Sequence, residues 1–350
     1  MSAAWVVRSG RMGERDSWAL QRSVTGGGWR ELPDLTPFKT REQVAAVVEE
    51  TYGKDKPEAL SNYTGQLWAL RDRIAVGDLV VMPMKTTKQI ALGRVTGGYE
   101  YLADESDPDR RHVIPVQWLH TDLPRTAIGK DLLFTLGGAT TIFQAKRHDA
   151  VWRLEQLAGS GEDPGPRAQP AIRVQRDQDS PDPVDNPEEN SDIEQVARDR
   201  IAALIQRSYA GHGLAVLTGA LLEAEGFRCT VSPPGADGGV DVLAGRGALG
   251  LDAPRLVVQV KSEPTAVGVA VINQLQGVLA SHEADQALLV AWGGVSKPAR
   301  QALTTRQFRV RIWDSEDVID SVLRNYDRLP DDIRTEVPLK RIWVLIDQES

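Results

Sequence analysis

Apolar and polar residues follow two different patterns along the chain, and the change falls near residue 158. In the first part, short apolar runs bounded by glycine and polar residues predict strands, and stretches of helical period predict helices. The predicted strands lie at 5–10, after a turn at 26–29, and at 77–85, 89–102 and 112–120; the predicted helices lie at 40–51, 63–73 and 145–157. Thr40 followed by Gln43 is the sequence of a capping box at a helix start. Residues 1–157 are therefore expected to form a β-rich α+β domain.

The last part, residues 193–350, has a different order of elements and longer buried runs. Helices are predicted at 193–208, 214–225, 269–281, 297–305 and 316–326, and strands at 227–232, 240–244, 256–262, 287–292 and 308–313. Helices that alternate with strands in this way favour an α/β domain with a mixed central sheet and helices on both faces.

The interval 158–192 is rich in Pro, Gly, Asp and Ser and has few apolar residues. Such a composition buries too little surface to fold, so the interval is predicted to be a linker. Eight acidic residues and no Lys or Arg occur between 177 and 194. The folded parts are therefore closer to neutral than the whole chain.

The 350 residues are 41% hydrophobic and 26% charged, which is typical of a soluble protein. The formal net charge of −8 means that no global field attracts nucleic acid, so such a partner would need a local basic patch. A single cysteine, Cys229, excludes an internal disulfide and suits a reducing compartment. With no signal-peptide core and no membrane-length apolar run, a cytoplasmic location and no membrane partner are expected.

The stretch 237–262 contains a run of apolar residues typical of a buried strand, interrupted by two polar residues, Gln259 and Lys261. On a strand, Gln259 and Lys261 point to the same face, and Val258 and Val260 to the other. An amine in such a run is costly unless it has a partner. Asp241 on the neighbouring predicted strand could pair with Lys261, or both could belong to a metal site. A solvated edge strand with an ordinary surface lysine fits the spacing as well.

The pattern GxD…QxK, between a helix ending in LLEAEGF and a strand ALLVAWGG, resembles the Mrr-type branch of the PD-(D/E)xK nuclease superfamily over about residues 211–320. In that branch, Gln replaces the middle acidic residue of the motif. The resemblance implies that Asp241, Gln259 and Lys261 are catalytic. It implies that Asp241, the Gln259 side chain and the Val260 backbone carbonyl hold Mg²⁺, with Mn²⁺ as a substitute. Lys261 would orient the attacking water and contact the scissile phosphate.

The chain departs from this family at one position. Many relatives carry a Glu near the start of the first core helix, where this sequence has Ala215. Glu223 lies about two turns further along, and it could be a solvent-facing acid or a ligand. Asp237, in a Gly-rich turn, is expected to be a turn residue. The departure leaves open that the site is slow, needs a partner's contribution or is inactive.

Three further residues are expected to contact the DNA backbone. Gln276 lies on the predicted helix 269–281, on one face with Asn273. Lys297 and Arg300 follow a GGVS turn at a helix start. A solvated helix face explains these side chains equally well.

The N-terminal part, with an early Trp-containing strand, GDLVV and a strand ending in GRVTGGY, resembles the PUA-like group that includes EVE domains. The resemblance implies a β-barrel-like module that binds nucleic acid and, in some relatives, a flipped-out modified base. Aromatic walls would stack on such a base. The candidate base-reading residues are Trp29, Trp68, Tyr99, Tyr101 and Trp118. Aromatic residues in a small β domain are also ordinary core residues.

Together these features predict a Mg²⁺-dependent endonuclease that restricts foreign or modified double-stranded DNA, with the N-terminal domain as reader. A double-strand break needs two active sites, so a homodimer is expected. Two alternatives remain: an inactive DNA-binding protein of the same fold, and a defence effector nuclease whose N-terminal domain senses a small molecule or partner protein. The sequence does not identify the modification, nor a role for the tail PLKRIWVL at 338–345.

Overall fold

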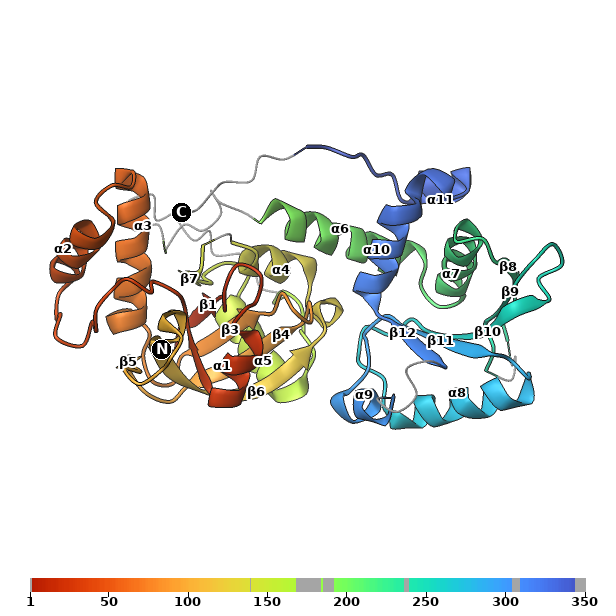
Figure 1. Cartoon of the computed structure of the whole chain (residues 1–350), viewed down its shortest axis with the longest axis horizontal. Helices are drawn as coiled ribbons and strands as arrows, with labels where there is room; N and C mark the ends of the chain where they lie inside the picture. Colours follow the sequence, from red (N-terminus) through yellow and green to blue (C-terminus); the bar gives the residue numbers. More distant parts are fainter. Residues whose placement is uncertain are drawn as a thin grey trace. The chain divides into compact units, whose positions relative to one another are not determined.

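The computed structural model describes residues 2–138, 140–167, 184, 192–235, 239–303 and 309–343. The chain divides into two compact units, Met1–Asp199 (unit 1) and Arg200–Ser350 (unit 2) (Figure 1). The division falls inside helix α6, Ile193–Ser208. Most of the predicted linker lies outside the described residues. Its first ten residues, 158–167, are described, and they begin with the end of helix α5, Ala150–Ser160.

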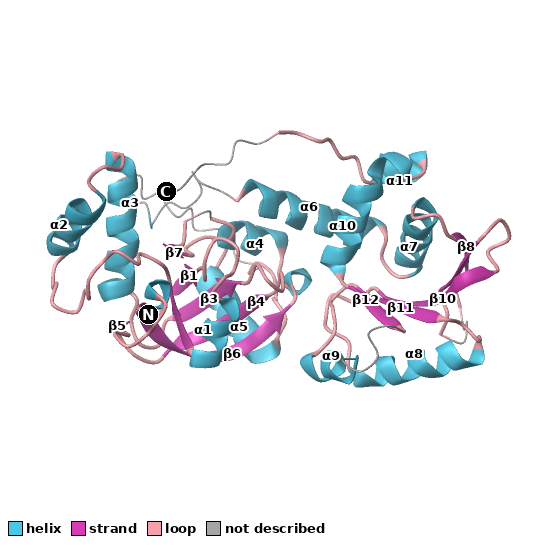
Figure 2. Cartoon of the chain, viewed as in Figure 1, coloured by secondary structure: helices cyan, strands magenta, loops and turns pink. Residues whose placement is uncertain are grey.

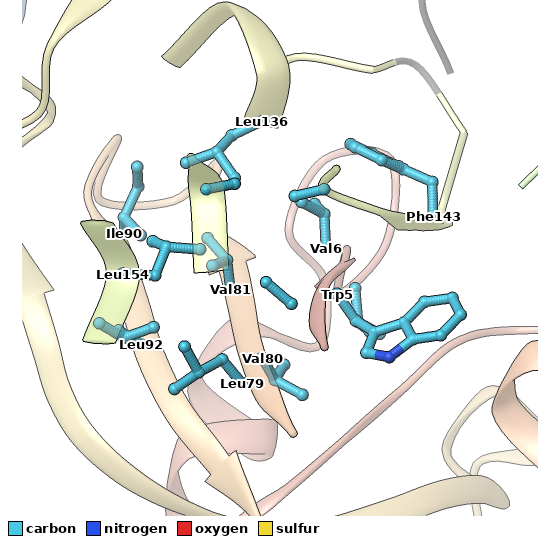
Figure 3. Close-up of a cluster of buried hydrophobic side chains, with 14 of the residues drawn as sticks. Trp5, Val6, Leu79, Val80, Val81, Ile90, Leu92, Leu136, Phe143 and Leu154 are labelled. Atoms are coloured by element: carbon cyan, nitrogen blue, oxygen red, sulfur yellow. The ribbon is translucent and has the colours of Figure 1, made fainter. Parts of the chain in front are cut away.

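Unit 1 is built on a seven-stranded sheet. Six strands follow the order β2-β6-β4-β3-β1-β7, and the seventh, β5, pairs with β6. The strands are β1 (Ala4–Val7), β2 (Val24–Gly26), β3 (Leu79–Pro83), β4 (Ile90–Val95), β5 (Glu100–Tyr101), β6 (His112–Leu123) and β7 (Ile142–Gln144). Strands β1 and β3 are parallel and the other pairs are antiparallel. Figure 3 shows the main core of this unit, in which Trp5, Leu79 and Phe143 are almost completely buried.

The helices of unit 1 are α1 (Asp16–Arg22), α2 (Arg41–Tyr52), α3 (Pro57–Trp68), which continues as a π-helical turn (Ala69–Arg73), α4 (Lys130–Leu136) and α5. The capping box at Thr40 is confirmed, because its side chain accepts the Gln43 N–H and the Gln43 side chain accepts the Thr40 N–H.

Several predicted boundaries in unit 1 are wrong. The strand expected at 5–10 ends at Val7, and the strand expected at 89–102 is two strands, β4 and β5. The helix expected at 63–73 begins at Pro57, because proline suits the first helical position and its fixed φ favours the helix. The helix expected from 145 begins at Ala150. Strand β2 precedes the turn at 26–29 instead of following it.

Unit 2 contains the predicted mixed sheet, with the strand order β12-β11-β10-β9-β8. The strands are β8 (Arg228–Val231), β9 (Val242–Arg246), β10 (Asp252–Lys261), β11 (Gln286–Ala291) and β12 (Val310–Trp313). Strands β10, β11 and β12 are parallel, whereas β8, β9 and β10 are antiparallel. The carboxyl ends of the three parallel strands therefore meet at one edge of the sheet.

Helices cover both faces of this sheet, as predicted. They are α7 (His212–Ala224), α8 (Val269–Ser281), α9 (Lys297–Leu303), α10 (Ser315–Asn325) and α11 (Asp331–Glu336). Figure 2 shows α8 and α9 on one side of β10–β12 and α10 on the other. Alternate residues of β10 enter two different cores: Val258 packs with residues of α7 and α10, and Val257 with residues of α8 and α9. Among the described residues, no helix is long and apolar enough to cross a membrane.

Candidate active site

Hydrogen bonds hold Asp241, which lies next to the start of β9, against Val258 and Val260 of β10. Asp241 directly precedes β9, and its N–H donates to the Val258 carbonyl at 2.9 Å. Its carboxylate Oδ2 accepts the Val260 N–H at 2.7 Å. Because the N–H and C=O of one strand residue point to the same side, the Val260 carbonyl also faces Asp241. The structure thus brings together the predicted carboxylate and the predicted backbone oxygen.

Gln259 lies on the opposite face of β10 from Val258 and is only 2% exposed. Its Oε1 is buried and has no hydrogen-bond partner among the described residues. Its Nε2 lies 3.4 Å from the point where a Cβ on Gly239 would stand, and the Nε2 of Gln274 lies 3.3 Å from the same point. A buried polar atom without a partner lowers the stability of the fold by about 1–3 kcal/mol. A purely structural role in the strand therefore does not explain this amide.

Lys261 ends β10 and is half-buried. Its ammonium group has no hydrogen-bond or ion-pair partner among the described residues, so the expected alternative of an ion pair with Asp241 is wrong. The alternative of an edge strand is also wrong, because β10 pairs with β9 on one side and β11 on the other.

One cavity of about 210 Å³ contains Asp241, Val260 and Lys261 in its wall. The other lining residues are Gly211, His212, Pro233, Pro234, Gly235, Ser262 and Glu263. The cavity therefore lies at the carboxyl end of β10, where the loop after β8 and the start of α7 close around it.

The donor atoms at this place suit a hard divalent cation. They are the carboxylate of Asp241 and the backbone carbonyl of Val260. The Gln259 side chain, whose amide oxygen lacks a partner among the described residues, does not line the cavity. Mg²⁺ prefers oxygen ligands of these kinds and retains several waters. No group of three His, Cys, Asp or Glu side chains suited to a metal exists in the described part of the chain. A metal here would depend on the neutral oxygens as well as on Asp241.

A family model described as a restriction endonuclease, Mrr_cat, matches residues 206–322. These residues form a restriction endonuclease domain. The resemblance inferred from GxD…QxK is thereby confirmed. A second model, described only as a domain of unknown function, matches residues 5–132, so the PUA-like identity of unit 1 stays a prediction. No curated protein matches the chain.

Three solved structures are similar to the chain at low identity. The protein of unknown function AF1548 is 17% identical over 31% of this chain and 65% of its own, with a TM-score of 0.26. The DNA modification-dependent restriction endonuclease AspBHI is 15% identical over 81% of this chain and 74% of its own, with a TM-score of 0.33. The MspJI restriction endonuclease, solved with a 27-mer oligonucleotide, is 15% identical over 96% of this chain and 80% of its own, with a TM-score of 0.32. Scores this low establish no equivalence of individual positions.

Sequence reasoning missed two chemically useful side chains of the endonuclease domain, His212 and Glu263. His212 is the first residue of α7, after Gly211, whose φ of +61° favours glycine. The Gly211 N–H donates to the Ser262 hydroxyl at 3.2 Å, which fixes the start of this helix beside the end of β10. The position of His212 depends on this tertiary contact, which no local pattern predicts. Glu263, two residues after Lys261, could have been found by extending the strand period.

The helix of the endonuclease domain that lacks the family's Glu places Ala215 in the core, with no exposed surface. Glu223, on the same helix, is exposed and does not line the cavity. Burial raises the pKa of the nearby Cys229 thiol to about 12, and the charge of Glu223 adds to this rise. Asp237 lies outside the described residues.

None of the three predicted DNA-contact residues lines the cavity. Gln276 is half-buried on α8 and its Nε2 has no partner among the described residues. Lys297 and Arg300 are exposed on α9, which follows the carboxyl end of β11. Their contact with DNA stays a prediction.

The five predicted base-reading residues in unit 1 are all half-buried, and four of them gather in one region. Trp29, Trp68 and Tyr99 pack against one hydrophobic cluster that includes Leu35 and Val44. The Tyr101 ring meets His112 edge-on at 5.1 Å between centroids, and the Tyr99 hydroxyl is hydrogen-bonded to His112 Nδ1 at 2.8 Å. Trp118 packs in a different cluster, with Met82 and Met84. A packing role is therefore visible for each residue, and a role in base reading stays a prediction.

His112 is 2% exposed, and burial lowers the pKa of its imidazole to about 4. Its partner Tyr99 also accepts the Leu35 N–H at 3.2 Å, and the same burial raises the pKa of the Tyr99 hydroxyl. These bonds attach the loop containing Leu35 to the strands.

Two of the buried arginines in unit 1, Arg15 and Arg153, differ in their partners. Arg153 has no exposed surface and is hydrogen-bonded to the carboxylates of Asp131 and Asp163. Arg15 is 8% exposed, and its guanidinium has no hydrogen bond or ion pair with any described residue. Its Nη2 lies 3.3 Å from the point where a Cβ on Gly27 would stand. Burial lowers the pKa of Arg15.

Proposed function

We propose that the protein is a metal-dependent DNA endonuclease that hydrolyses phosphodiester bonds at Asp241, Gln259 and Lys261. The observation that carries the proposal is the shared cavity of Asp241, Val260 and Lys261 within a restriction endonuclease domain. The buried oxygen of Gln259 on the same strand, which has no hydrogen-bond partner among the described residues, supports it.

Asp241, the Val260 carbonyl and the Gln259 amide oxygen would hold Mg²⁺, with Mn²⁺ as a substitute. When bound, such an ion supplies a more acidic water and stabilises the charge that develops on the phosphate. Lys261 has no hydrogen-bond or ion-pair partner among the described residues, and its ammonium would orient the attacking water and contact a phosphate oxygen. The hydrogen bond from Val260 fixes the Asp241 carboxylate in place. A neutral Gln in place of an acid weakens the attraction for the metal.

Unit 1 would select the DNA to be cut. The endonuclease domain contacts phosphates, which carry little sequence information, so selectivity must come from elsewhere in the chain. The aromatic residues Trp29, Trp68, Tyr99 and Tyr101 are candidates for contact with a modified base. Cleavage of both strands of a duplex would take two copies of the chain. The biological role proposed is restriction of foreign or modified DNA in the cytoplasm.

The test is cleavage of unmodified, cytosine-methylated and hydroxymethylated duplexes by the full chain with Mg²⁺ or Mn²⁺. Cleavage that is abolished by EDTA and by Lys261→Ala is expected, with a preference among the three duplexes. Tight binding without cleavage by the unaltered chain would contradict the proposal and favour a DNA-binding protein whose site is inactive. The absence of both binding and cleavage of the duplexes would contradict the proposal under these conditions. That result would favour an effector nuclease that requires an activating ligand or partner.

A further inference from the structure

We infer that Glu263 supplies a second carboxylate to this metal site, in place of the acid that position 215 lacks. This inference rests on the proposed function and concerns the same cavity. Glu263 lines that cavity together with Asp241 and Lys261.

The backbone places Glu263 on the same side of the chain as Lys261. The Lys261 carbonyl accepts the Trp292 N–H at 2.8 Å, and the Glu263 carbonyl accepts the Gly293 N–H at 3.0 Å. Both carbonyls thus face the chain that leaves β11, and the segment after β10 stays extended. Residues two apart in an extended chain direct their side chains to the same face.

The Glu263 carboxylate is available for a ligand. The side chain is exposed and has no hydrogen bond or ion pair with any described residue. Its backbone carbonyl is held by the Gly293 N–H, just after β11, so the carboxylate reorients by side-chain rotation. An exposed glutamate in the wall of a cavity can therefore turn toward a cation without any change in the fold.

The charge of the site favours a second acid. Asp241 contributes one negative charge, Lys261 one positive charge, and Gln259 and Val260 only neutral oxygens. Among the described residues these charges cancel, and a divalent cation would then gain little net attraction. Mg²⁺ sites in proteins usually have one or two carboxylates beside water and substrate oxygens. With Glu263 the site has a net charge of −1 before the metal binds.

The other candidates fit less well. Ala215 offers no donor atom and lies in the core, and Glu223 is exposed away from the cavity. His212 also lines the cavity, but imidazole nitrogen suits zinc, copper, iron and nickel ions, whereas Mg²⁺ and Mn²⁺ prefer carboxylate oxygen.

The experiment is calorimetric titration of the full chain with Mn²⁺ alone, without DNA. Four proteins are compared: the unaltered chain, Glu263→Gln, Glu223→Gln and Asp241→Asn. Each substitution keeps the shape of the side chain and removes one charge. Glu263→Gln is expected to weaken the Mn²⁺ affinity about 10-fold, a change of 1.4 kcal/mol in binding free energy. Glu223→Gln is expected to leave the affinity within twofold, and Asp241→Asn to abolish measurable binding.

Cleavage provides a second measurement. If Glu263 holds the metal, excess Mn²⁺ restores most of the cleavage rate of Glu263→Gln, and the unaltered chain reaches its maximum at lower Mn²⁺. Affinity of Glu263→Gln equal to that of the unaltered chain, with Asp241→Asn deficient, would overturn the role of Glu263 alone. Unchanged binding by Asp241→Asn as well would overturn the metal site of the proposed function.

Discussion

The end of β10 in unit 2 and the aromatic region of unit 1 use their side chains in opposite ways. At the end of β10, the Gln259 amide oxygen and the Lys261 ammonium have no partners among the described residues, and Lys261 lines a cavity. In the aromatic region, Tyr99 has two hydrogen-bond partners, and Trp29 and Trp68 pack against a hydrophobic cluster. Groups without partners reduce stability and so indicate chemistry. Well-packed aromatic residues are explained by the fold alone, and contact with a base is an additional hypothesis.

The same contrast separates Arg153 from Arg15 inside unit 1. Arg153, on α5, is hydrogen-bonded to the carboxylates of Asp131 and Asp163, and these bonds attach α5 to the segments that contain the two acids. Arg15 is nearly as buried and has no such partner among the described residues. Arg153 is held by direct hydrogen bonds to carboxylates, whereas Arg15 has only the longer-range attraction of Asp109, Glu14 and Asp107.

The largest predicted effect concerns Asp241, whose charge and hydrogen bond can be separated. Asp241→Asn removes the charge but can still accept the Val260 N–H, whereas Asp241→Ala removes both. Cleavage is expected to fall at least ~100-fold in both variants, since electrostatic groups at active sites contribute effects of that order. Thermal unfolding should show a loss of about 1 kcal/mol in the alanine variant only. Cleavage by the asparagine variant at the normal rate would show that the carboxylate charge is not used.

Trp68 tests whether the aromatic region is primarily a core. Trp68→Ala is expected to destabilise unit 1 by about 3 kcal/mol, because a large aromatic side chain leaves the cluster. Trp343 is fully exposed, so Trp343→Ala is the matched control and should leave the unfolding midpoint unchanged. Unaltered stability of Trp68→Ala, combined with weaker DNA binding, would instead identify Trp68 as a base-reading residue.

His112 makes unit 1 sensitive to acid. Its pKa is about 4 in the folded protein and near 6.5 in the unfolded chain, so the unfolded chain binds more protons between these values. Stability is therefore present above about pH 6.5 and decreases as the pH falls toward 4, by on the order of 2 kcal/mol. Denaturant unfolding followed at several pH values would measure this slope. The slope should become shallower in His112→Gln, and an equal slope in both proteins would exclude His112 as its source.

Arg15 and Arg153 are distinguished by the sign of the predicted change in stability. Arg15→Met removes an unpaired buried charge and is expected to raise the stability of unit 1 by about 1 kcal/mol. Arg153→Met leaves two carboxylates without their partner and is expected to lower it by about 3 kcal/mol. Thermal unfolding of the two variants measures both. A loss of stability in Arg15→Met would mean that its guanidinium does have a partner in the folded protein.

The strand at the site could be predicted because its geometry is strictly periodic. The two-residue spacing of Gln259 and Lys261 placed them on one face, and the mixed sheet followed from the order of apolar runs. The cavity could not be predicted, since Gly211, the loop at 233–235 and Glu263 meet only through tertiary contacts. The short elements α1 and β7 give too few periods to recognise. The clustering of Trp29 with Tyr99 likewise depends on packing between segments far apart in the sequence.

The most direct test of the central claim is cleavage of a supercoiled plasmid in Mg²⁺ by Lys261→Ala and Lys297→Ala, measured side by side with the unaltered chain. Both variants remove one lysine from unit 2, but only Lys261 lines the cavity. The expected result is loss of cleavage in Lys261→Ala and at most a few-fold reduction in Lys297→Ala. Cleavage by Lys261→Ala at the rate of the unaltered chain would contradict the assignment of the chemistry to this cavity.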